Sequence, residues 1–341
     1  LAGTASTVAP TADAGTDATV AAGAGTEPTI AAGAGAGHEG TLAAPLAPVV
    51  LADLSVIAHA GSSGATTRTV GDDLRGASIE RFDEVPRNRF ELQGELARGG
   101  LGRVMRARDP RTGRVVALKE VLRPSPDLIA RFAREAMVTA NLQHPAIVPV
   151  YEVGRWPEGE PFYAMKLVDG RSLDAELQDA RTLRERLALV PRLIDVAEAI
   201  AYAHGQGVIH RDLKPANVLV GSYGETVVID WGLARRSGDP EAALSSSLVG
   251  VISGAVTLVG DVVGTPAYMP PEQARGEEVD ARADVYALGA LAYMMLAGQP
   301  PFIANSSSEV MALHILATPR QLNELAPNVP IEVVVYPDTY T

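Results

Sequence analysis

Three polar side chains stand close together in the chain, directly after the apolar pair at 208–209. They are Asp212, Lys214 and Asn217, in the sequence His-Arg-Asp-Leu-Lys-Pro-Ala-Asn. Residues of these types usually lie in solvated surface loops. Their combination nevertheless has a chemical use: phosphoryl transfer needs a carboxylate to accept a hydroxyl proton, a cation near the moving phosphate and an oxygen ligand for Mg²⁺. The set is therefore a candidate phosphoryl-transfer site.

The same stretch resembles the catalytic loop of eukaryotic-like, bacterial-type serine/threonine protein kinases. The resemblance implies that Asp212 orients a substrate hydroxyl and accepts its proton, that Lys214 neutralises the transferring charge, and that Asn217 binds Mg²⁺. It also implies a second Mg²⁺ ligand, Asp230, in an Asp-Trp-Gly where the family usually has Asp-Phe-Gly. Two short apolar runs between these motifs, at 218–220 and 227–229, predict a β-hairpin that delivers Asp230.

A glycine-rich turn precedes these motifs, at 94–105, and reads as strand, turn and strand. By itself it fits a simple hairpin equally well. The resemblance implies that it covers the phosphates of ATP, that Lys119 at the end of the strand 115–119 aligns them, and that Glu135, midway along a predicted helix over 127–142, holds this lysine. The other nucleotide contacts implied by the resemblance, with Met165 behind the adenine, are Leu96, Ala97 (in place of the first glycine), Gly99, Gly100, Gly102, Val104, Ala117, Met165 and Leu219.

Further parts of the resemblance concern regulation and support. The segment 233–264 fits an activation loop, in which Thr257 is the favoured phosphorylation site and Arg211 the residue that grips the phosphate. The sequence Gly-Thr-Pro-Ala-Tyr-Met-Pro-Pro-Glu that follows resembles a protein-substrate platform, in which Thr265 would contact the catalytic loop. Asp284 would hold the backbone of that loop, although it could also act as a helix cap.

Two helix and side-chain predictions can be tested directly. The periodicity of 182–206 predicts one long amphipathic helix that buries Leu187, Val190, Ile194, Ala197 and Ala201. Pro191 should either kink this helix or mark its true start. Trp231, in place of the usual Phe, is expected to pack against the helix that carries Glu135.

The amino-acid composition limits the binding partners and the cellular location that we expect for the chain. The chain of 341 residues has a net charge of −12, which argues against broad nucleic-acid binding and attraction to anionic membranes. It has no Cys, so disulfides and Cys metal sites are excluded. Its longest uncharged apolar run, 248–260, is shorter than the roughly 18 to 20 residues of a membrane-spanning helix. We therefore expect no membrane segment in this chain and a cytoplasmic location.

The chain divides by composition into three predicted parts. Residues 1–85 are rich in Ala, Gly and Thr and are predicted to be a disordered tail. An imperfect repeat in it places Thr19 and Thr29 alike; it is either a flexible leader or a pair of phosphorylation sites for a phosphothreonine-reading partner. The resemblance implies an α+β, bilobal fold, with a small antiparallel β lobe and one main helix at 88–168 and a mainly helical large lobe at 169–341. No arginine matches the usual partner of Glu272, so the last helices of the large lobe are expected to be missing.

The resemblance implies an ATP-dependent kinase that phosphorylates Ser or Thr hydroxyls of proteins, itself included, in signalling. Lys214 favours Ser or Thr over Tyr as the acceptor. Two other functions remain open at this point. A kinase-shaped scaffold would bind nucleotide without transferring phosphate, and a small-molecule kinase would share an Asp and an Asn in a similar loop but would have no use for the platform at 264–272.

Overall fold

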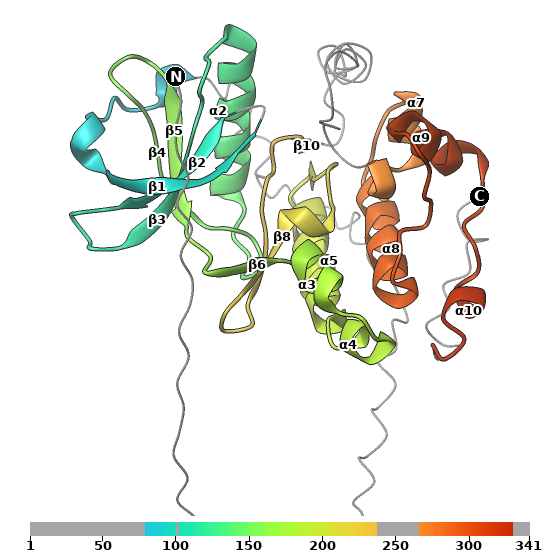
Figure 1. Cartoon of the computed structure of the whole chain (residues 1–341). Helices are drawn as coiled ribbons and strands as arrows, with labels where there is room; N and C mark the ends of the chain where they lie inside the picture. Colours follow the sequence, from blue (N-terminus) through green and yellow to red (C-terminus); the bar gives the residue numbers. More distant parts are fainter. Residues whose placement is uncertain (1–78, 100–101, 237–265, 330–341) are drawn as a thin grey trace, which may run out of the picture. The chain divides into compact units, whose positions relative to one another are not determined.

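A five-stranded antiparallel sheet carries most of the residues predicted to hold the nucleotide. The computed structural model describes residues 79–99, 102–236 and 266–329, all within one unit of the chain, Val50–Thr341 (Figure 1). The sheet has the strand order β1-β2-β3-β5-β4. Its strands are β1 (Glu91–Arg98), β2 (Arg103–Arg108), β3 (Val115–Glu120), β4 (Val150–Arg155) and β5 (Pro161–Lys166). The predicted small β lobe and the predicted strand at 115–119 are confirmed.

One long helix covers one face of this sheet. Helix α2 (Pro126–Asn141) begins where Ser125 Oγ accepts a hydrogen bond from the Leu128 N–H (3.3 Å), with proline at its first position. Phe132, Ala133 and Ala136 face inward and share a buried cluster with Tyr163 of β5. The other face of the sheet is filled by a second cluster around Phe90, Trp156 and Phe162. The helix predicted over 127–142 is thus confirmed, and its buried side fixes it on the sheet.

The folded part of the chain starts earlier than the sequence predicted. The segment 79–90 contains two short 3-10 helices, η2 (Ile79–Arg81) and η3 (Arg87–Arg89). Its backbone is bonded to β4, since the Val85 N–H donates to Arg155 O (2.8 Å) and the Arg155 N–H to Asp83 O (3.0 Å). Phe82 is only 5% exposed, in the cluster with Phe132 of α2. The predicted disordered tail is therefore wrong for residues 79–85, and residues 1–78 lie outside the described part.

This contact predicts how the segment will respond to loss of one side chain. We expect Phe82→Ala to weaken the segment's attachment to α2 and to lower the free energy of unfolding by about 2 kcal/mol. This is less than the about 3–5 kcal/mol typical of Phe in a core that cannot relax, because a short segment outside the sheet can detach while the sheet stays folded. Urea unfolding and hydrogen exchange at 79–90 would measure both effects. Leu92→Ala, at a half-exposed position of β1, is the control. Unchanged exchange at 79–90 in Phe82→Ala would contradict the prediction.

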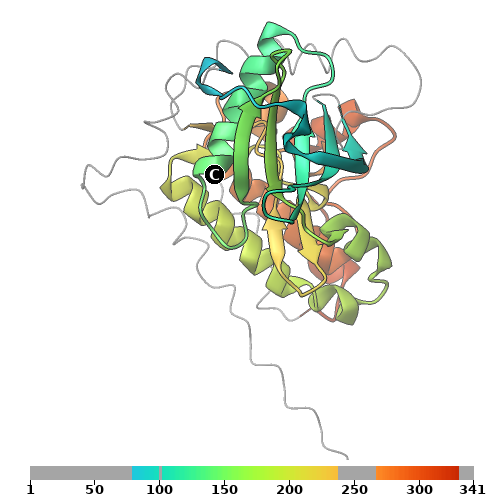
Figure 2. The same ribbon diagram turned by 90° about the vertical axis from the view of Figure 1, so that its left-hand side faces the viewer.

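The large lobe is built on two helices that pack together. Helices α5 (Val190–Gly205) and α8 (Arg282–Ala297) bury Val196, Ile200 and Leu291 in one cluster, to which the hairpin strands contribute Val218 and Val228. Beside them lies a three-stranded sheet of order β6-β8-β9, formed by β6 (Gly170–Ser172), β8 (Val218–Gly221) and β9 (Thr226–Val228) (Figure 2). The predicted hairpin before Asp230 is confirmed.

The single helix predicted over 182–206 is wrong. The structure has two helices there, α4 (Leu183–Leu187) and α5, separated at Ala188 and Leu189. Pro191 stands in the first turn of α5 and marks its true start, where a missing N–H costs nothing. The five residues predicted to be buried are only partly so, because α5 turns an adjacent face to the core. The fully buried residues of α5 are Leu193, Val196, Ala199, Ile200 and Ala203.

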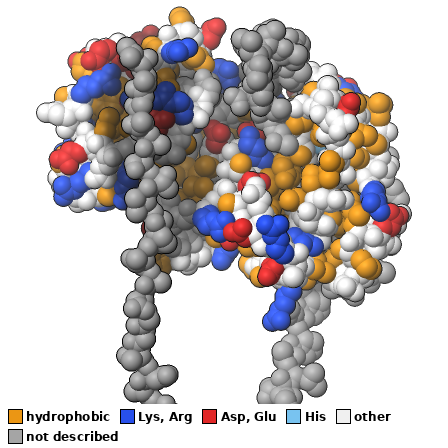
Figure 3. Space-filling view, in the orientation of Figure 1, with side chains coloured by type: hydrophobic (Ala, Val, Ile, Leu, Met, Phe, Trp, Pro, Cys, Tyr) orange, Lys and Arg blue, Asp and Glu red, His pale blue; other side chains and the backbone are white. Residues whose placement is uncertain are grey.

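The remaining elements are short. They are α3 (Leu173–Asp179), β7 (Val208–Ile209), η4 (Pro215–Asn217), β10 (Arg235–Arg236), η5 (Pro266–Tyr268), α7 (Pro271–Arg275), α9 (Ser307–Leu316) and α10 (Leu322–Leu325). Hydrophobic side chains cover much of the large-lobe surface in the view of Figure 3. Within the described part of the chain, none of the helices combines the length and the apolar character needed to cross a membrane. The expected loss of the last helices concerns residues from 330 onward, which lie outside the described part.

Candidate active site

The three predicted catalytic-loop residues lie in mutual contact. Lys214 Nζ lies 2.7 Å from Asp212 Oδ2, and Asn217 Nδ2 donates to the same oxygen (3.1 Å) and to the Asp212 backbone carbonyl (2.8 Å). The loop between β7 and η4 brings them together, and the side chain of Asp212 stays about one third exposed. A carboxylate with one face held and another open to solvent can meet a substrate hydroxyl.

The hairpin β8–β9 places Asp230 next to this loop. The Ile229 N–H donates to the Asn217 backbone carbonyl (2.9 Å), which ties the residue before Asp230 to the end of the catalytic loop. Asp230 has a φ of +64°, a left-handed conformation that costs a non-glycine residue about 1–2 kcal/mol. Its side chain is 41% exposed. A strained, solvent-facing carboxylate is a feature of sites shaped for function rather than for stability.

Lys119 interacts with one carboxylate of the small lobe and one carboxylate of the large lobe. Its ammonium group contacts Glu135 Oε1 of α2 and lies 3.3 Å from Asp230 Oδ1 of the large lobe. Burial alone lowers the pKa of Lys119, but the negative charges of Glu135 and Asp230 outweigh it and raise the pKa above its ordinary value. Burial likewise raises the pKa of Asp230, but the electrostatic effects of Lys119 and His210 and the hydrogen bond from Lys119 together outweigh it, so the pKa is lowered. Lys119 and Asp230 are therefore both charged at neutral pH.

The oxygen atoms around Asp230 fit a Mg²⁺ ion brought by a nucleotide. Asn217 uses its Nδ2 on Asp212, which leaves its Oδ1 as an acceptor, and Asp230 supplies a carboxylate. Oxygen ligands of this kind suit Mg²⁺. Among the described residues, no group of three or more His, Cys, Asp or Glu side chains could hold a metal alone. A site with one carboxylate and one amide therefore needs phosphate oxygens to complete the coordination of the ion.

The residues predicted to contact the nucleotide fall on both sides of this cluster. In the sheet, Val104 pairs with Lys119, and Ala117 pairs with Met165, so these positions are neighbours. Leu219 lies on β8, opposite Ser172. Leu96 and Ala97 are exposed on β1, as is Gly99 beyond it. Met165 and Leu219 are only partly buried, which leaves both available to a ligand.

The glycine-rich turn is fixed at its last glycine, Gly102. The Gly99 N–H donates to Gly102 O (2.9 Å), which closes the turn between β1 and β2. A Cβ on Gly102 would lie 2.1 Å from the Glu120 carbonyl oxygen, so any side chain there would force β2 away from β3. Gly100 lies outside the described residues. Gly102 is thus needed for close packing beside Lys119, in addition to its predicted part in covering the phosphates.

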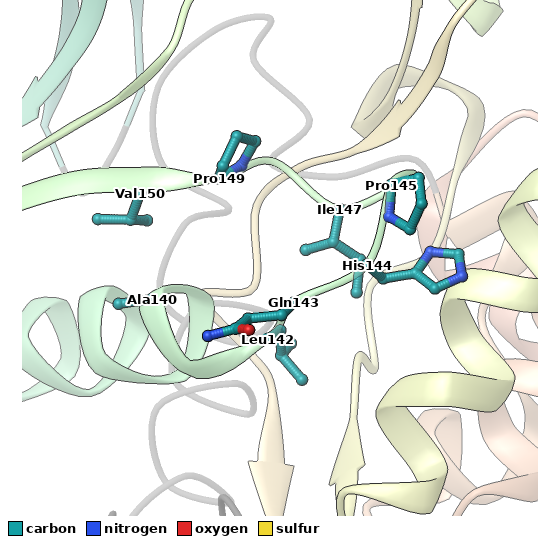
Figure 4. A pocket seen from close by; sticks show the side chains of 8 residues that line it. All are labelled: Ala140, Leu142, Gln143, His144, Pro145, Ile147, Pro149 and Val150. Atoms are coloured by element: carbon teal, nitrogen blue, oxygen red, sulfur yellow. The ribbon is translucent and has the colours of Figure 1, made fainter.

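A pocket of about 320 Å³ lies apart from the predicted site residues (Figure 4). It is formed where α2 ends and the chain turns into β4. Figure 4 shows Ala140 of α2 and Val150 of β4 at one end of it and His144 and Pro145 at the other, with Ile147 nearer the middle. None of the residues predicted to contact nucleotide, substrate or metal lines it. The chemistry assigned above does not depend on this pocket.

As predicted, Asp284 binds the backbone of the catalytic loop. Its Oδ2 accepts the His210 N–H and its Oδ1 the Arg211 N–H, both at 2.8 Å. Arg211 has a φ of +68°, so these bonds hold the backbone in a conformation that it would not adopt alone. Burial raises the pKa of Asp284, but the hydrogen bond from His204 and the electrostatic effect of His210 outweigh it, and the pKa is lowered. Asp284 makes no cap at the start of α8.

Removing this charge should destabilise the chain in a pH-dependent way. We expect Asp284→Asn to lower the free energy of unfolding at pH 7 by about 3 kcal/mol, because buried donors lose their anionic acceptor. Since the carboxyl is more acidic in the folded chain, its contribution is present above its unfolded pKa of about 3.9 and is lost as pH falls through the folded value. Urea unfolding between pH 7 and pH 3 should therefore show a difference that shrinks in acid.

The matched control for this change is Asp280→Asn. Asp280 is half-exposed and pairs with the exposed Arg282, so its loss should cost less than about 1 kcal/mol. Equal losses in the two variants at pH 7 would show that Asp284 is no better an acceptor than a surface carboxylate.

Trp231 is buried where the catalytic loop meets α2. Its ring centroid lies 4.7 Å from that of His210, and both residues are less than 2% exposed. It shares a buried cluster with Val138, one turn beyond Glu135 on α2. This agrees with the expectation that the Trp packs toward that helix. The cluster includes residues of α2 and of the catalytic loop, such as Val138 and Leu213.

Two residues of the site were missed by sequence reasoning. His204 Nε2 lies 2.8 Å from Asp284 Oδ2, and the Tyr163 hydroxyl donates to Glu135 Oε1 (2.6 Å). Both act across the fold on a carboxylate far away in sequence, and neither stands in a motif. For Tyr163 a signal existed in principle, because it lies two residues before Met165 on the same face of β5, but the pairing with β3 was needed to use it.

Several regulatory predictions fall on residues outside the described part. These are the phosphorylation site Thr257, the substrate contact of Thr265 and the sites Thr19 and Thr29. Arg211 is described, and its Nη2 donates to Val279 O (2.9 Å). Its proposed grip on a phosphorylated loop stays a prediction.

Comparison with known proteins supports the interpretation of these motifs. The family model described as protein kinase domain matches residues 90–332. A probable serine/threonine-protein kinase of Streptomyces coelicolor is 38% identical over 259 residues, which cover 73% of this chain and 37% of the relative. The serine/threonine-protein kinase PknB of Mycolicibacterium smegmatis is 39% identical over 238 residues, or 68% and 36%. The DNA damage-responsive serine/threonine-protein kinase RqkA of Deinococcus radiodurans is 38% identical over 256 residues, or 73% and 36%.

The chain thus spans little more than a third of the length of these curated relatives. The matched region nevertheless contains the whole cluster of Lys119, Glu135, Asp212, Asn217 and Asp230, on a sheet and helices arranged as the resemblance implied. The family match covers well over half of the chain, and on this ground the chain belongs to the protein kinase family, with bacterial serine/threonine kinases among its relatives.

Proposed function

We propose that this chain transfers the γ-phosphate of ATP to Ser or Thr hydroxyls of proteins. The observation that carries the proposal is the contact of Lys119 with both Glu135 of α2 and Asp230 of the large lobe. This contact joins the element that would hold the phosphates to the element that would hold the metal. A structural salt bridge has no need of a third charged group that is 41% exposed and strained.

Each residue has a separate part in the proposed reaction. Asp212 orients the substrate hydroxyl and accepts its proton. Lys214, which contacts Asp212, lies where it can neutralise charge on the transferring group. Lys119, fixed by Glu135, aligns the phosphates, and the glycine-rich turn excludes water from them. The catalysis consists of positioning and electrostatic stabilisation, as phosphoryl transfer requires.

Asn217 and Asp230 would hold Mg²⁺ together with the phosphates. Bound there, the ion would neutralise negative charge on the ATP phosphate oxygens. The hydrogen bonds of Asn217 to Asp212 keep the proposed metal ligand and the proposed base in register. Movement of one residue would therefore displace the other.

The substrate class is proposed to be protein. The element η5 (Pro266–Tyr268), which belongs to the predicted platform, contacts α8 and α9 and is largely buried on them. This packing would hold the platform in place for a peptide substrate. The chain itself is one candidate substrate, and a phosphothreonine-reading partner of Thr19 and Thr29 is another proposed interaction. We place the reaction in the cytoplasm, where ATP and Mg²⁺ are both supplied.

The test is a transfer assay with the full chain, γ-labelled ATP and Mg²⁺, with and without an added basic protein substrate. We expect label on Ser or Thr of the chain or of the added protein, and none when Mg²⁺ is chelated. Nucleotide binding without any labelled protein would overturn the proposal and favour a scaffold. Label appearing only on a small-molecule acceptor would favour a small-molecule kinase.

A further inference from the structure

A tyrosine outside the recognised motifs contacts the same carboxylate oxygen as Lys119. Tyr163 lies on β5, directly opposite Lys119 on the neighbouring strand β3, so both side chains point from the sheet toward α2. The Tyr163 hydroxyl donates to Glu135 Oε1 at 2.6 Å, and Lys119 Nζ contacts this same oxygen. Two donors on adjacent strands thus hold one acceptor on the helix.

The surroundings fix Tyr163 as a donor. It is 3% exposed, and its ring lies 5.3 Å, centroid to centroid, from Phe132 of α2. Burial and the negative charge of Glu135 raise the pKa of Tyr163 well above its ordinary value, so the hydroxyl keeps its proton. A short bond from a neutral hydroxyl to a buried carboxylate belongs to the stronger class of hydrogen bonds.

Glu135 has few other partners. It is 2% exposed, and its second oxygen, Oε2, has no hydrogen-bond partner among the described residues. A buried carboxylate needs donors to offset its lost hydration. One of its two donors, Lys119, is shared with Asp230 and, in the proposed reaction, with the phosphates of ATP. When Lys119 interacts with these groups instead of with Glu135, Tyr163 remains as the hydrogen-bond donor to Glu135.

We propose that Tyr163 is a positioning residue that fixes Glu135, and with it α2, while Lys119 engages the nucleotide. Its hydroxyl acts through Glu135, while its ring, whose centroid also lies 5.9 Å from Lys119 Nζ, is 3% exposed. The inference rests on the proposed function for its effect on rate, but its effect on α2 can be measured without any transfer. It assigns to β5 a second task besides carrying Met165 toward the adenine.

The test is Tyr163→Phe in the full chain, which removes the hydroxyl and keeps the ring against Phe132. We expect phosphoryl transfer to fall about tenfold, as for loss of a hydrogen bond to a charged group. We also expect hydrogen exchange of the α2 amides to rise selectively. Tyr151→Phe is the matched control, since it makes the same chemical change at a 42% exposed position of the adjacent strand β4. It should leave both measurements unchanged.

Each outcome decides the inference. A rate within twofold of the unchanged chain would reject it, even if α2 exchanged faster. A rise of exchange shared equally by the sheet, α2 and α5 would also reject it, because the hydroxyl would then serve general stability alone. If the unchanged chain transfers no phosphate at all, the proposed function fails, and the selective rise in α2 exchange still decides whether Tyr163 fixes the helix.

Discussion

Asp212→Asn is expected to lower the rate of phosphoryl transfer by roughly a thousandfold, within the range for loss of a general base. The amide has nearly the same shape as the carboxylate, and its oxygen can still accept one of the two hydrogen bonds from Lys214 and Asn217. It cannot take up a proton from a substrate hydroxyl. Because Asp212 does not contact Lys119, ATP affinity should stay within about threefold, since only the transition state loses an interaction. Initial rates with labelled ATP and equilibrium binding of a fluorescent nucleotide measure the two quantities.

Glu198→Gln supplies the comparison for this variant. Glu198 is exposed on α5, the helix that leads into the catalytic loop, and the change removes one negative charge from the same lobe. Its rate should match that of the unchanged chain. Equal incorporation of label by the Asp212 variant and the unchanged chain would remove Asp212 from its proposed place as base.

The sequence motifs predicted the site better than they predicted the elements that support it. A catalytic loop has a fixed local order, so Asp212, Lys214 and Asn217 could be assigned together, and the structure places them in contact. Asp284 could be assigned for the same reason. The buried face of a helix is different, because more than one set of apolar residues on α5 has helical spacing. The structure buries the set Leu193, Val196, Ala199, Ile200 and Ala203 against other elements of the large lobe, and local spacing cannot choose between the sets.

Contacts that depend on strand register, or on a segment that packs against a helix distant in the sequence, could not be predicted from the sequence. Tyr163 reaches Glu135 only because β5 pairs with β3 in one register, and a shift by one residue would turn it to the other face. Phe82 stands in a highly charged segment with no helix or strand periodicity, yet it fills a space on α2. In both cases the decisive interaction is with residues that are distant in the chain. The pattern of neighbouring residues therefore could not predict it.

Asp230→Asn is expected to have an effect as large as that of Asp212→Asn, through the metal instead of the proton. Asn is among the residues that best tolerate a left-handed backbone, so the φ of +64° can be kept and the change is confined to charge. Lys119 retains Glu135 as a partner. Phosphoryl transfer should fall by roughly a thousandfold, as when one preorganised electrostatic contact to the transition state is lost. Binding of ATP should no longer tighten when Mg²⁺ is added.

The Mg²⁺ dependence separates this prediction from a general loss of structure. In the unchanged chain, nucleotide affinity measured at rising Mg²⁺ should increase, whereas in the variant it should stay flat and match the unchanged chain without Mg²⁺. Glu225→Gln tests the same kind of change on the hairpin that delivers Asp230, where the partner is Lys166 at 3.3 Å on a part-exposed surface. Such a pair is worth little, so its affinity should follow that of the unchanged chain. A Mg²⁺ response that survives in Asp230→Asn would mean that the metal is held elsewhere, and the assignment of this carboxylate would have to be given up.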